Sequence, residues 1–229
     1  MGFNPTPVIT GTLVRLRPPS SDDVAILHAL MADREVTVLT GSTHTSEPAG
    51  TNPWTVEELQ QVYAGWAERS ERHVWAIVDR AADAVVGEVL LTDLDEGNQS
   101  CGLRIWIAGA TGRGLGTEAT RLALGQAFET EGLHRVQLEE YAFNPRARRV
   151  YEKAGFVVEG TMREALLFDD AWVDAHLMAI LAREWFEPPT AHRAWNPDMA
   201  ETRKSQPSTN AGGDAIRAAR AEGARPGQP

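Results

Sequence analysis

The alternation of hydrophobic and polar positions predicts several short strands in the first half of the chain. Segments rich in β-branched and aliphatic side chains are residues 13–17, 74–79, 84–92 and 100–107. Short polar turns at 80–83 and 95–98 separate the last three of these segments. We therefore expect the three to form an antiparallel meander.

Apolar residues at helical spacing predict two helices between these strands. The first follows Ser20 or Ser21, either of which can act as an N-cap. The second follows Thr55, which forms a capping box with Glu58. A long polar loop over residues 40–53 lies between the two helices.

The second half of the chain alternates helical and extended patterns. The expected order is a helix at 115–130, a strand at 135–141, a helix at 145–153, and strands at 156–168 and 172–182. Gly155 is placed to end the second helix in the left-handed conformation, and Asp169-Asp170 forms the last turn. This order predicts an α/β (α+β) fold.

The composition changes after Trp185. Residues 187–229 are rich in Pro, Gly, Ser and Ala and have almost no large aliphatic side chains. Such a segment cannot bury enough apolar surface to offset the entropy of ordering. We expect one globular domain over residues 1–186 and a flexible low-complexity tail over residues 187–229.

Composition and charge exclude several classes of protein. Hydrophobic residues make up 42% of the 229 residues, enough for a core, and the net charge of −10 disfavours a nucleic-acid partner. Cys101 is the single cysteine, and no Cys/His cluster has zinc spacing, so we expect neither a disulfide framework nor a metal. No apolar run is long enough to cross a membrane, and no export signal is evident, so we expect a cytoplasmic protein.

A glycine-rich loop precedes the helix expected at residue 115. Gly112, Gly114 and Gly116 would let the main chain approach a phosphate, which the positive end of the helix dipole also attracts. This pattern predicts a phosphate-bearing cofactor.

The same loop also satisfies a dinucleotide-binding pattern. Residues 114–119 read G-x-G-x-x-A, and Glu139 and Glu140 follow about 20 residues later, where a ribose-binding acid would lie. Two features argue against this interpretation. Residues 108–111 intervene between the strand and the first glycine, and the fold ends in a hairpin rather than in further βαβ units.

Several spaced motifs together resemble the GNAT acetyltransferase superfamily. They are the glycine loop with Thr117-Glu118-Ala119, the segment from Asn144 to Phe156, Glu159-Gly160, and Arg163-Glu164-Ala165. Within the superfamily the chain is most similar to the ribosomal-protein N-terminal alanine and serine acetyltransferases, from about Gly11 to Trp185. The resemblance implies a mixed, mostly antiparallel sheet with a central splay, flanked by helices. It also implies acetyl-CoA as cosubstrate and an amine acceptor, and it leaves a homodimer open.

The resemblance assigns residues to the cofactor. A splayed strand would bind pantetheine and polarise the thioester carbonyl, the loop would bind the pyrophosphate, and further polar side chains would assist. These residues are Ile105, Trp106 and Ile107 on the strand, Gly112, Arg113, Gly114, Leu115, Gly116 and Thr117 in the loop, and Asn144 and Arg149 beyond it. Asn144 is equally suited to cap the helix that begins at Pro145.

The resemblance also suggests how protons are transferred. Tyr151 would protonate the departing thiolate, although a packed aromatic side chain is the alternative interpretation. Glu164 is the first candidate for the base that accepts the amine proton, with Glu140 and Glu88 as further candidates.

Three positions depart from the pattern of the family. Thr111 stands where Gln or Arg is usual, Ala147 where close relatives often have Ser, and Glu140 where an aliphatic strand residue is usual. The loop amides remain, but we do not expect the one phosphate contact that Gln or Arg would make at Thr111, and the hydroxyl near the thioester is absent at Ala147. Nothing in the sequence explains Glu140.

We therefore expect an acetyl-CoA-dependent N-acetyltransferase that acts on the α-amino group of a protein or peptide. Two alternatives stay open, a small-amine acetyltransferase of the antibiotic or metabolite type and a non-catalytic acyl-CoA-binding module. The loop at residues 40–53, with Trp54, is expected to line the acceptor side.

Overall fold

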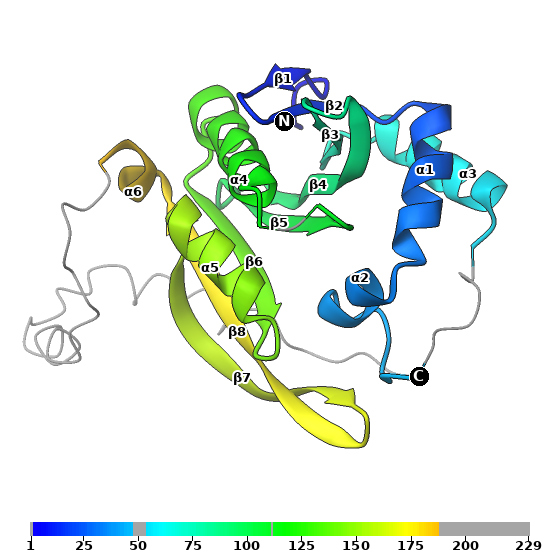
Figure 1. Ribbon diagram of the computed structural model, residues 1–229. Coiled ribbons are helices and arrows are strands. Elements are labelled where there is room, and N and C mark those ends of the chain that lie inside the picture. The colour runs from blue at the N-terminus through cyan, green and yellow to red at the C-terminus, as the bar shows by residue number, and fades with distance from the viewer. Residues whose placement is uncertain (1, 48–53, 111, 188–229) are drawn as a thin grey trace, which may run out of the picture. The chain divides into compact units, whose positions relative to one another are not determined.

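The computed structural model describes residues 2–47, 54–110 and 112–187. Within them, eight strands form one sheet in the order β1-β2-β3-β4-β5-β6-β8-β7 (Figure 1). The strands are β1 Ile9–Thr10, β2 Val14–Arg17, β3 His73–Asp79, β4 Ala84–Asp95, β5 Ser100–Ile107, β6 Arg135–Tyr141, β7 Val157–Phe168 and β8 Ala171–Leu181. Neighbours are antiparallel except for the parallel pair of β5 and β6.

The expected meander is confirmed by β3, β4 and β5, which pair in sequence order. All seven residues of β3 are buried, because helices cover both faces of this part of the sheet. The expected strand at residues 13–17 corresponds to β2, which pairs with β3, while the two-residue β1 beyond it was not predicted.

The expected central splay is also present. Strands β5 and β6 pair only at their first residues, where Ser100, Cys101 and Gly102 face Arg135, Val136 and Gln137. Beyond these pairs the two strands diverge, as Figure 1 shows. The β6-facing edge of residues 103–107 is therefore unpaired within the described part of the sheet.

Helices lie on both faces of the sheet. One face carries α4 (Leu115–Gly125) and α5 (Pro145–Ala154), and the other carries α1 (Ser21–Met31) and α3 (Val56–Ala67) (Figure 1). The end of the helix expected at 115–130 is a π-helical segment, Gln126–Thr130. Two short helices were not predicted, α2 (Arg34–Leu39) and α6 (Ala182–Phe186).

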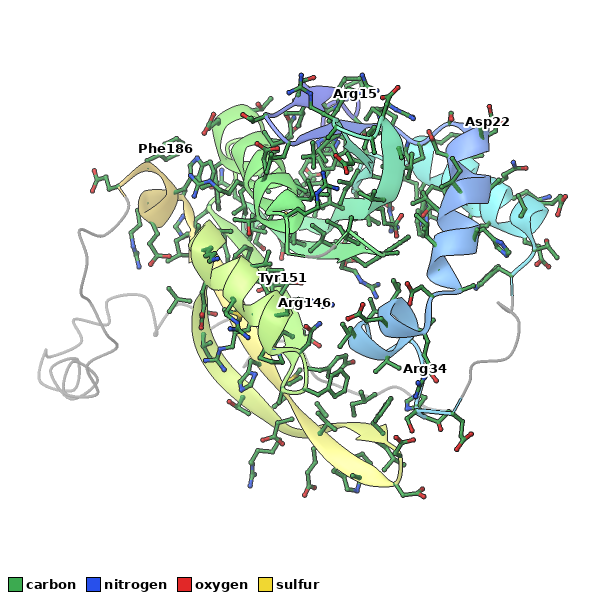
Figure 2. The ribbon with its side chains drawn as sticks, in the orientation of Figure 1. Arg15, Asp22, Arg34, Arg146, Tyr151 and Phe186 are labelled. Carbon is green, nitrogen blue, oxygen red and sulfur yellow. The ribbon has the colours of Figure 1, made fainter. Side chains whose placement is uncertain are left out.

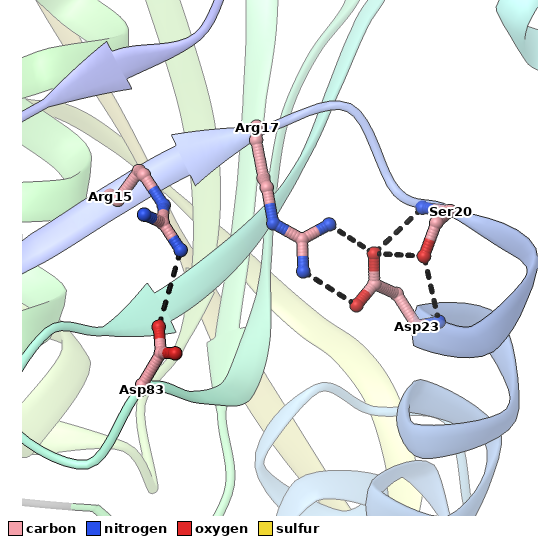
Figure 3. A network of polar contacts seen from close by, with 5 residues as sticks. All are labelled: Arg15, Arg17, Ser20, Asp23 and Asp83. Carbon is pink, nitrogen blue, oxygen red and sulfur yellow. Dashed lines mark hydrogen bonds and ion pairs between the residues drawn. The ribbon is translucent and has the colours of Figure 1, made fainter.

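The start of α1 is fixed by the N-cap expected there. The Ser20 side chain accepts from the Asp23 backbone N–H, and the Asp23 carboxylate accepts from the Ser20 backbone in return (Figure 3). Arg17 of β2 binds the same carboxylate with both terminal nitrogens. This ion pair ties α1 to the sheet and lowers the pKa of Asp23, although burial opposes the effect.

Glu118, which belongs to the glycine-loop motif, has a structural partner. Its carboxylate accepts the backbone N–H groups of Thr12, Leu13 and Val14 at 2.9, 2.6 and 2.7 Å. These bonds fasten the turn between β1 and β2 to the first turn of α4. The motif therefore joins the N-terminal segment to the helix that follows the loop.

Some expectations lie outside the described residues. These include Thr111, the part of the polar loop at 48–53, and residues 188–229 of the expected tail, so the domain boundary stays a prediction. In the described part of the chain, no helix has the length and apolar character needed to cross a membrane.

Candidate active site

The glycine loop has the backbone that its sequence predicts. Gly112 and Gly114 have φ values of 79° and 85°, a region that L side chains rarely adopt. Gly114 is the N-cap of α4, and no side chain caps this helix. The first amides of α4 are therefore available to an anion, and the helix dipole favours that charge.

Gly116, in the first turn of α4, lies within van der Waals contact of two other elements. A Cβ at this position would lie 3.7 Å from Ile107 Cδ1 and 3.9 Å from Val150 Cγ1. Since Ile107 is on β5 and Val150 is on α5, this first turn of α4 lies beside both of these elements. The glycine loop, β5 and α5 thus meet at one place, at the splay.

Arg113 is paired within the protein. Its Nη1 donates to Asp79 Oδ2 at 2.5 Å, and this carboxylate is buried while the guanidinium is half exposed. The interaction with Arg113 lowers the pKa of Asp79. Contact between Arg113 and a cofactor phosphate remains a prediction, and the observed role of Arg113 is to anchor the loop to β3.

Residues 105–107 of β5 have a strand partner on one edge only. Ile105, Trp106 and Ile107 pair with β4, while their opposite edge faces the splay. Ile105 and Ile107 pack toward α4, whereas Trp106 lies on the other face. The free main-chain groups at this edge can hydrogen-bond to an extended ligand.

Trp106 is held by a buried carboxylate that the sequence analysis considered as a base. Glu88, its partner on β4, accepts from Trp106 Nε1 at 2.9 Å with one oxygen and from the Tyr63 hydroxyl with the other. Burial raises the pKa of Glu88. Because both of its oxygens have protein donors, Glu88 is occupied in positioning Trp106.

Asn144 caps α5. Its Oδ1 accepts from the Ala147 backbone N–H at 3.0 Å, and its Nδ2 donates to the Leu39 carbonyl at 3.4 Å. Arg146, the second residue of α5, pairs with Glu35 of α2 at 2.6 Å. These contacts draw α2 toward the start of α5, and a role for Asn144 in cofactor binding remains a prediction.

Tyr151 lies on the buried face of α5 (Figure 2). It is 8% exposed, and its ring contacts Phe156 edge-on at 5.9 Å between centroids. Among the described residues its hydroxyl has no hydrogen-bond partner. Burial, together with the charge of Glu140, raises the pKa of Tyr151.

Glu140, which is buried, pairs with the partly buried His176 next to Tyr151. They face each other across β6 and β8, with Glu140 Oε2 at 3.0 Å from His176 Nδ1. Burial raises the pKa of Glu140, an effect that His176 partly opposes. Glu140 Oε1 is also buried and has no partner among the described residues. No sequence pattern indicates this pair, and His176 had no predicted role.

Glu164 lies apart from these groups. It is exposed in an irregularity of β7 where φ is 53°, and its backbone N–H donates to Asp174. Strand β8 separates β7 from β6, so Glu164 is on the edge of the sheet, away from the splay. Its role as a base remains a prediction, and the placement favours a carboxylate closer to the splay.

Glu139 is such a carboxylate, and it was not among the bases predicted from the sequence. It neighbours Glu140 on β6 but points to the opposite face, because successive strand residues alternate. Its side chain is exposed and has no hydrogen-bond partner among the described residues. Glu139 and Glu140 are both carboxylates on β6, and the register of this strand decides which of them is exposed and which is buried.

The described part of the expected acceptor loop is tied to the β7–β8 turn. Thr45 Oγ1 and the Ser46 backbone N–H donate to Asp169 Oδ1 at 3.1 and 2.6 Å, and the Asp169 backbone N–H donates to the His44 carbonyl at 3.0 Å. The bonds from Ser46 lower the pKa of Asp169. Residues 44–46, which follow α2 in the chain, are therefore hydrogen-bonded to the turn of the β7–β8 hairpin.

The arginines of α5 differ in availability. Arg146 and Arg148 pair with Glu35 and Glu152, respectively. Arg149 is exposed and donates to the Pro145 carbonyl at 3.2 Å, without a carboxylate partner in the described part of the chain. Of the three, Arg149 is the cation best placed to meet an anionic ligand. The described residues contain no cluster of three or more His, Cys, Asp or Glu side chains suited to a metal.

Comparison with known proteins identifies the family. The sequence pattern described as "Acetyltransferase (GNAT) domain" matches residues 14–157, which is more than half of the chain. The chain therefore belongs to the GNAT acetyltransferases, and the expected fold is confirmed. The match runs from β2 through α5 and so includes the glycine loop, the splay and Tyr151.

Two curated relatives come from Bacillus subtilis. "Probable N-acetyltransferase YjcK" is 33% identical over half of this chain and 64% of its own length. "Putative ribosomal N-acetyltransferase YdaF" is 33% identical over 44% of this chain and 56% of its own length. The aligned parts thus span less than two thirds of either relative.

A solved structure shares the fold over a longer range. Spermidine N-acetyltransferase from Vibrio cholerae, in complex with CoA and spermine, superimposes with a TM-score of 0.66 and 24% identity. The match covers 76% of this chain and 99% of that protein. This likeness establishes a common architecture.

Proposed function

We propose that the protein transfers the acetyl group of acetyl-CoA to a primary amine, by direct attack of the amine in a ternary complex. The observation that carries the proposal is the meeting of three features at the splay. These are the free edge of β5, the uncapped N-terminus of α4 and the unpartnered Tyr151 hydroxyl. The two Bacillus subtilis relatives support this chemistry, since both are named as N-acetyltransferases.

Acetyl-CoA would bind on the α4 and α5 face of the sheet. The loop residues Gly112–Thr117 would hold its pyrophosphate through backbone N–H groups, and Arg149 would add a cation. The pantetheine arm would follow the free edge of Ile105–Ile107. A backbone N–H from this strand would polarise the thioester carbonyl and stabilise the developing oxyanion.

Two proton transfers accompany the reaction. The departing thiolate would receive a proton from Tyr151, which is buried and positioned on the cofactor side. The amine must lose a proton, but an α-amine has a pKa of about 8 and is already partly neutral near pH 7, so a weak base is sufficient. Glu164 and Glu139 are the exposed carboxylates that we consider for this step.

The acceptor is proposed to be the α-amino group of a protein or peptide. The YdaF relative, named for a ribosomal acceptor, supports this choice, and the net charge of −10 suits a cationic partner. A small amine is the second candidate, because a further relative of this chain is a spermidine N(1)-acetyltransferase from Vibrio cholerae. The two sequences are 28% identical over 75% of the length of that relative.

An acetyl-transfer assay tests the proposal. Release of free CoA thiol is followed with acetyl-CoA and a panel of peptides with free α-amines, the same peptides with blocked termini, and polyamines. Turnover with free but not blocked peptides supports a peptide acceptor, and turnover with polyamines alone supports the small-amine alternative. Binding of acetyl-CoA without turnover across the panel would favour a non-catalytic module.

Matched variants identify the base. Glu139→Gln and Glu164→Gln each replace one exposed carboxylate with a neutral side chain of similar shape, so both should fold normally. The variant that lacks the base is expected to have a lower kcat than the wild-type protein, most strongly at low pH, where less of the amine is neutral. The other variant serves as the control, and an unchanged kcat in both would assign proton removal to solvent.

A further inference from the structure

The buried carboxylate of Glu140 has one satisfied oxygen and one that is open. Glu140 is 4% exposed, its Oε2 interacts with His176 Nδ1 at 3.0 Å, and its Oε1 is buried without a partner among the described residues. A buried carboxylate oxygen without a donor is costly, unless the oxygen carries a proton or meets a ligand or water. Pairing of β6 with β8 alone therefore does not explain why Glu140 Oε1 is buried without a donor.

Charged groups around Glu140 come from two elements. His176 faces it from β8, while Arg148, Glu152 and Tyr151 face it from α5. Arg148 and Glu152 pair with each other at 3.0 Å, so their opposite charges largely offset at Glu140. His176 is thus the principal partner of Glu140 in the described part of the chain. Its side chain, 18% exposed, reaches solvent.

Tyr151 needs help to act as an acid. A phenol has an ordinary pKa of about 10 and a thiol of about 8.5, so a proton moves from phenol to thiolate against the equilibrium. Burial raises the pKa of Tyr151 further. A tyrosinate at this position would be unstable unless its proton were replaced as it left.

We propose that Glu140 and His176 form a proton relay that replaces the proton of Tyr151 when Tyr151 protonates the departing coenzyme A thiolate. The proposal rests on the proposed acetyl transfer. Before the step, the pair holds a proton on Glu140 Oε1, while the neutral ring of His176 donates from Nδ1 to Oε2. The open oxygen is then a hydrogen-bond donor rather than an acceptor, which accounts for its lack of a protein donor.

The step balances in atoms and charge. The Tyr151 O–H bond breaks as the S–H bond of coenzyme A forms, and the phenol oxygen takes the Glu140 proton through one bridging water, since the two groups are not in direct hydrogen-bond contact. Glu140 becomes a carboxylate, stabilised by the Nδ1–H of His176. A proton from solvent then binds Nε2 of His176 as the Nδ1 proton passes to Glu140 Oε2. Rotation of the carboxyl group and return of the ring to its Nδ1–H tautomer by exchange with solvent restore the starting state.

The principal test is His176→Asn. The asparagine Nδ2 can occupy the place of Nδ1 and keep the hydrogen bond to Glu140, but it cannot carry a proton from solvent. We expect kcat for acetyl transfer to fall about 10-fold or more while KM for acetyl-CoA stays unchanged. The alkaline limb of the kcat profile, which reports loss of the proton from the pair, should move in His176→Asn and disappear in Glu140→Gln.

His73 and Glu131 provide a matched control, because they form a second histidine–carboxylate pair, also at 3.0 Å, on β3 and after the π-helical segment. In this pair the interaction is through Nε2, so Gln is the isosteric replacement. His73→Gln should lower the thermal midpoint without changing the shape of the kcat profile. A purely structural role for the Glu140–His176 pair predicts the same behaviour for His176→Asn.

The outcomes separate the relay from the proposed function. Folded His176→Asn and Glu140→Gln variants with wild-type kcat and pH profile would overturn the relay and leave acetyl transfer intact. Absence of turnover in the wild-type protein with every acceptor would instead contradict the proposed function. Thermal melts decide whether each variant is folded, and if one is not, the other carries the test. Loss of the fold in both assigns the pair to stability and rejects the relay.

Discussion

Tyr151→Phe removes one oxygen atom from the proposed proton donor and keeps the ring in place. The ring is buried, and its edge-on contact with Phe156 does not involve the hydroxyl. Since the hydroxyl has no hydrogen-bond partner among the described residues, the substitution leaves no acceptor unsatisfied there. The free energy of unfolding should change by less than about 1 kcal/mol.

The effect on turnover should be much larger. Loss of a general acid lowers kcat by about 10²-fold at the lower end of the known range, which corresponds to about 2.7 kcal/mol of transition-state stabilisation. Acetyl-CoA affinity should stay near the wild-type value, because the thiolate appears only after attack. Chemistry and binding are thus expected to separate in this variant.

The assay combines three measurements on the same protein, namely kcat from thiol release, acetyl-CoA affinity by calorimetry, and unfolding by denaturant. Tyr63→Phe is the contrasting variant, because it strands a buried oxygen of Glu88 and should cost about 1–3 kcal/mol of stability. Wild-type kcat in Tyr151→Phe would refute the assignment and leave thiolate protonation to solvent.

Four further outcomes are expected. Acetyl-CoA at about 100 times its Kd should stabilise the protein by roughly 2.7 kcal/mol in a thermal melt, whereas NAD should have no effect, and the reverse result would contradict the cofactor assignment. Glu118→Ala, which removes the acceptor of three backbone N–H groups, should lower the free energy of unfolding by about 2–3 kcal/mol, measured with denaturant. Burial lowers the pKa of His73, so the unfolded state binds a proton at this ring more readily than the folded state does. The free energy of unfolding, measured with denaturant, should therefore fall as the pH drops below about 6.5, and a His73→Gln variant should lack this part of the pH dependence. Truncation after Phe186 should leave acetyl transfer intact, and loss of activity in a folded truncated protein would place the tail in the site.

Local signals were sufficient for most of the fold. The capping boxes at Ser20 and Thr55 and the left-handed Gly155 all occur where the sequence predicted helix boundaries. Each depends on residues within one turn of helix, so the information is contained in a short segment. The meander of β3, β4 and β5 was equally accessible, because short turns join sequential strands.

The elements that were missed are short and depend on distant contacts. Helix α2 has six residues, too few for a clear helical period, and isolated helices of this length are not stable. It is held by contacts with α5, from Arg146 to Glu35 and from Asn144 to the Leu39 carbonyl. The residues of these pairs are more than 100 positions apart, so no local pattern indicates them.

The candidate site shows the same division. The glycine loop and the Asn144 cap are encoded in contiguous motifs and were predicted. The pairs of Arg113 with Asp79 and of Glu140 with His176 join residues 34 and 36 positions apart. The first depends on where the glycine loop lies against β3 and the second on the register of β6 and β8, and neither can be deduced from sequence spacing. Glu164 was chosen from its motif alone, and the strand order that places it on the edge was not available from the sequence.

The register of β6 has a consequence for the direction of proton flow. Glu139 and Glu140 are adjacent, yet strand alternation sends them to opposite faces, with Glu140 buried against the cofactor-side helices and Glu139 exposed on the other face. Pairing of Glu140 with His176 fixes this choice, because a one-residue slip would exchange the two carboxylates. If Glu139 takes the amine proton, one strand handles both proton transfers of the reaction, and the sheet itself separates the proton released by the amine from the proton delivered to the thiolate.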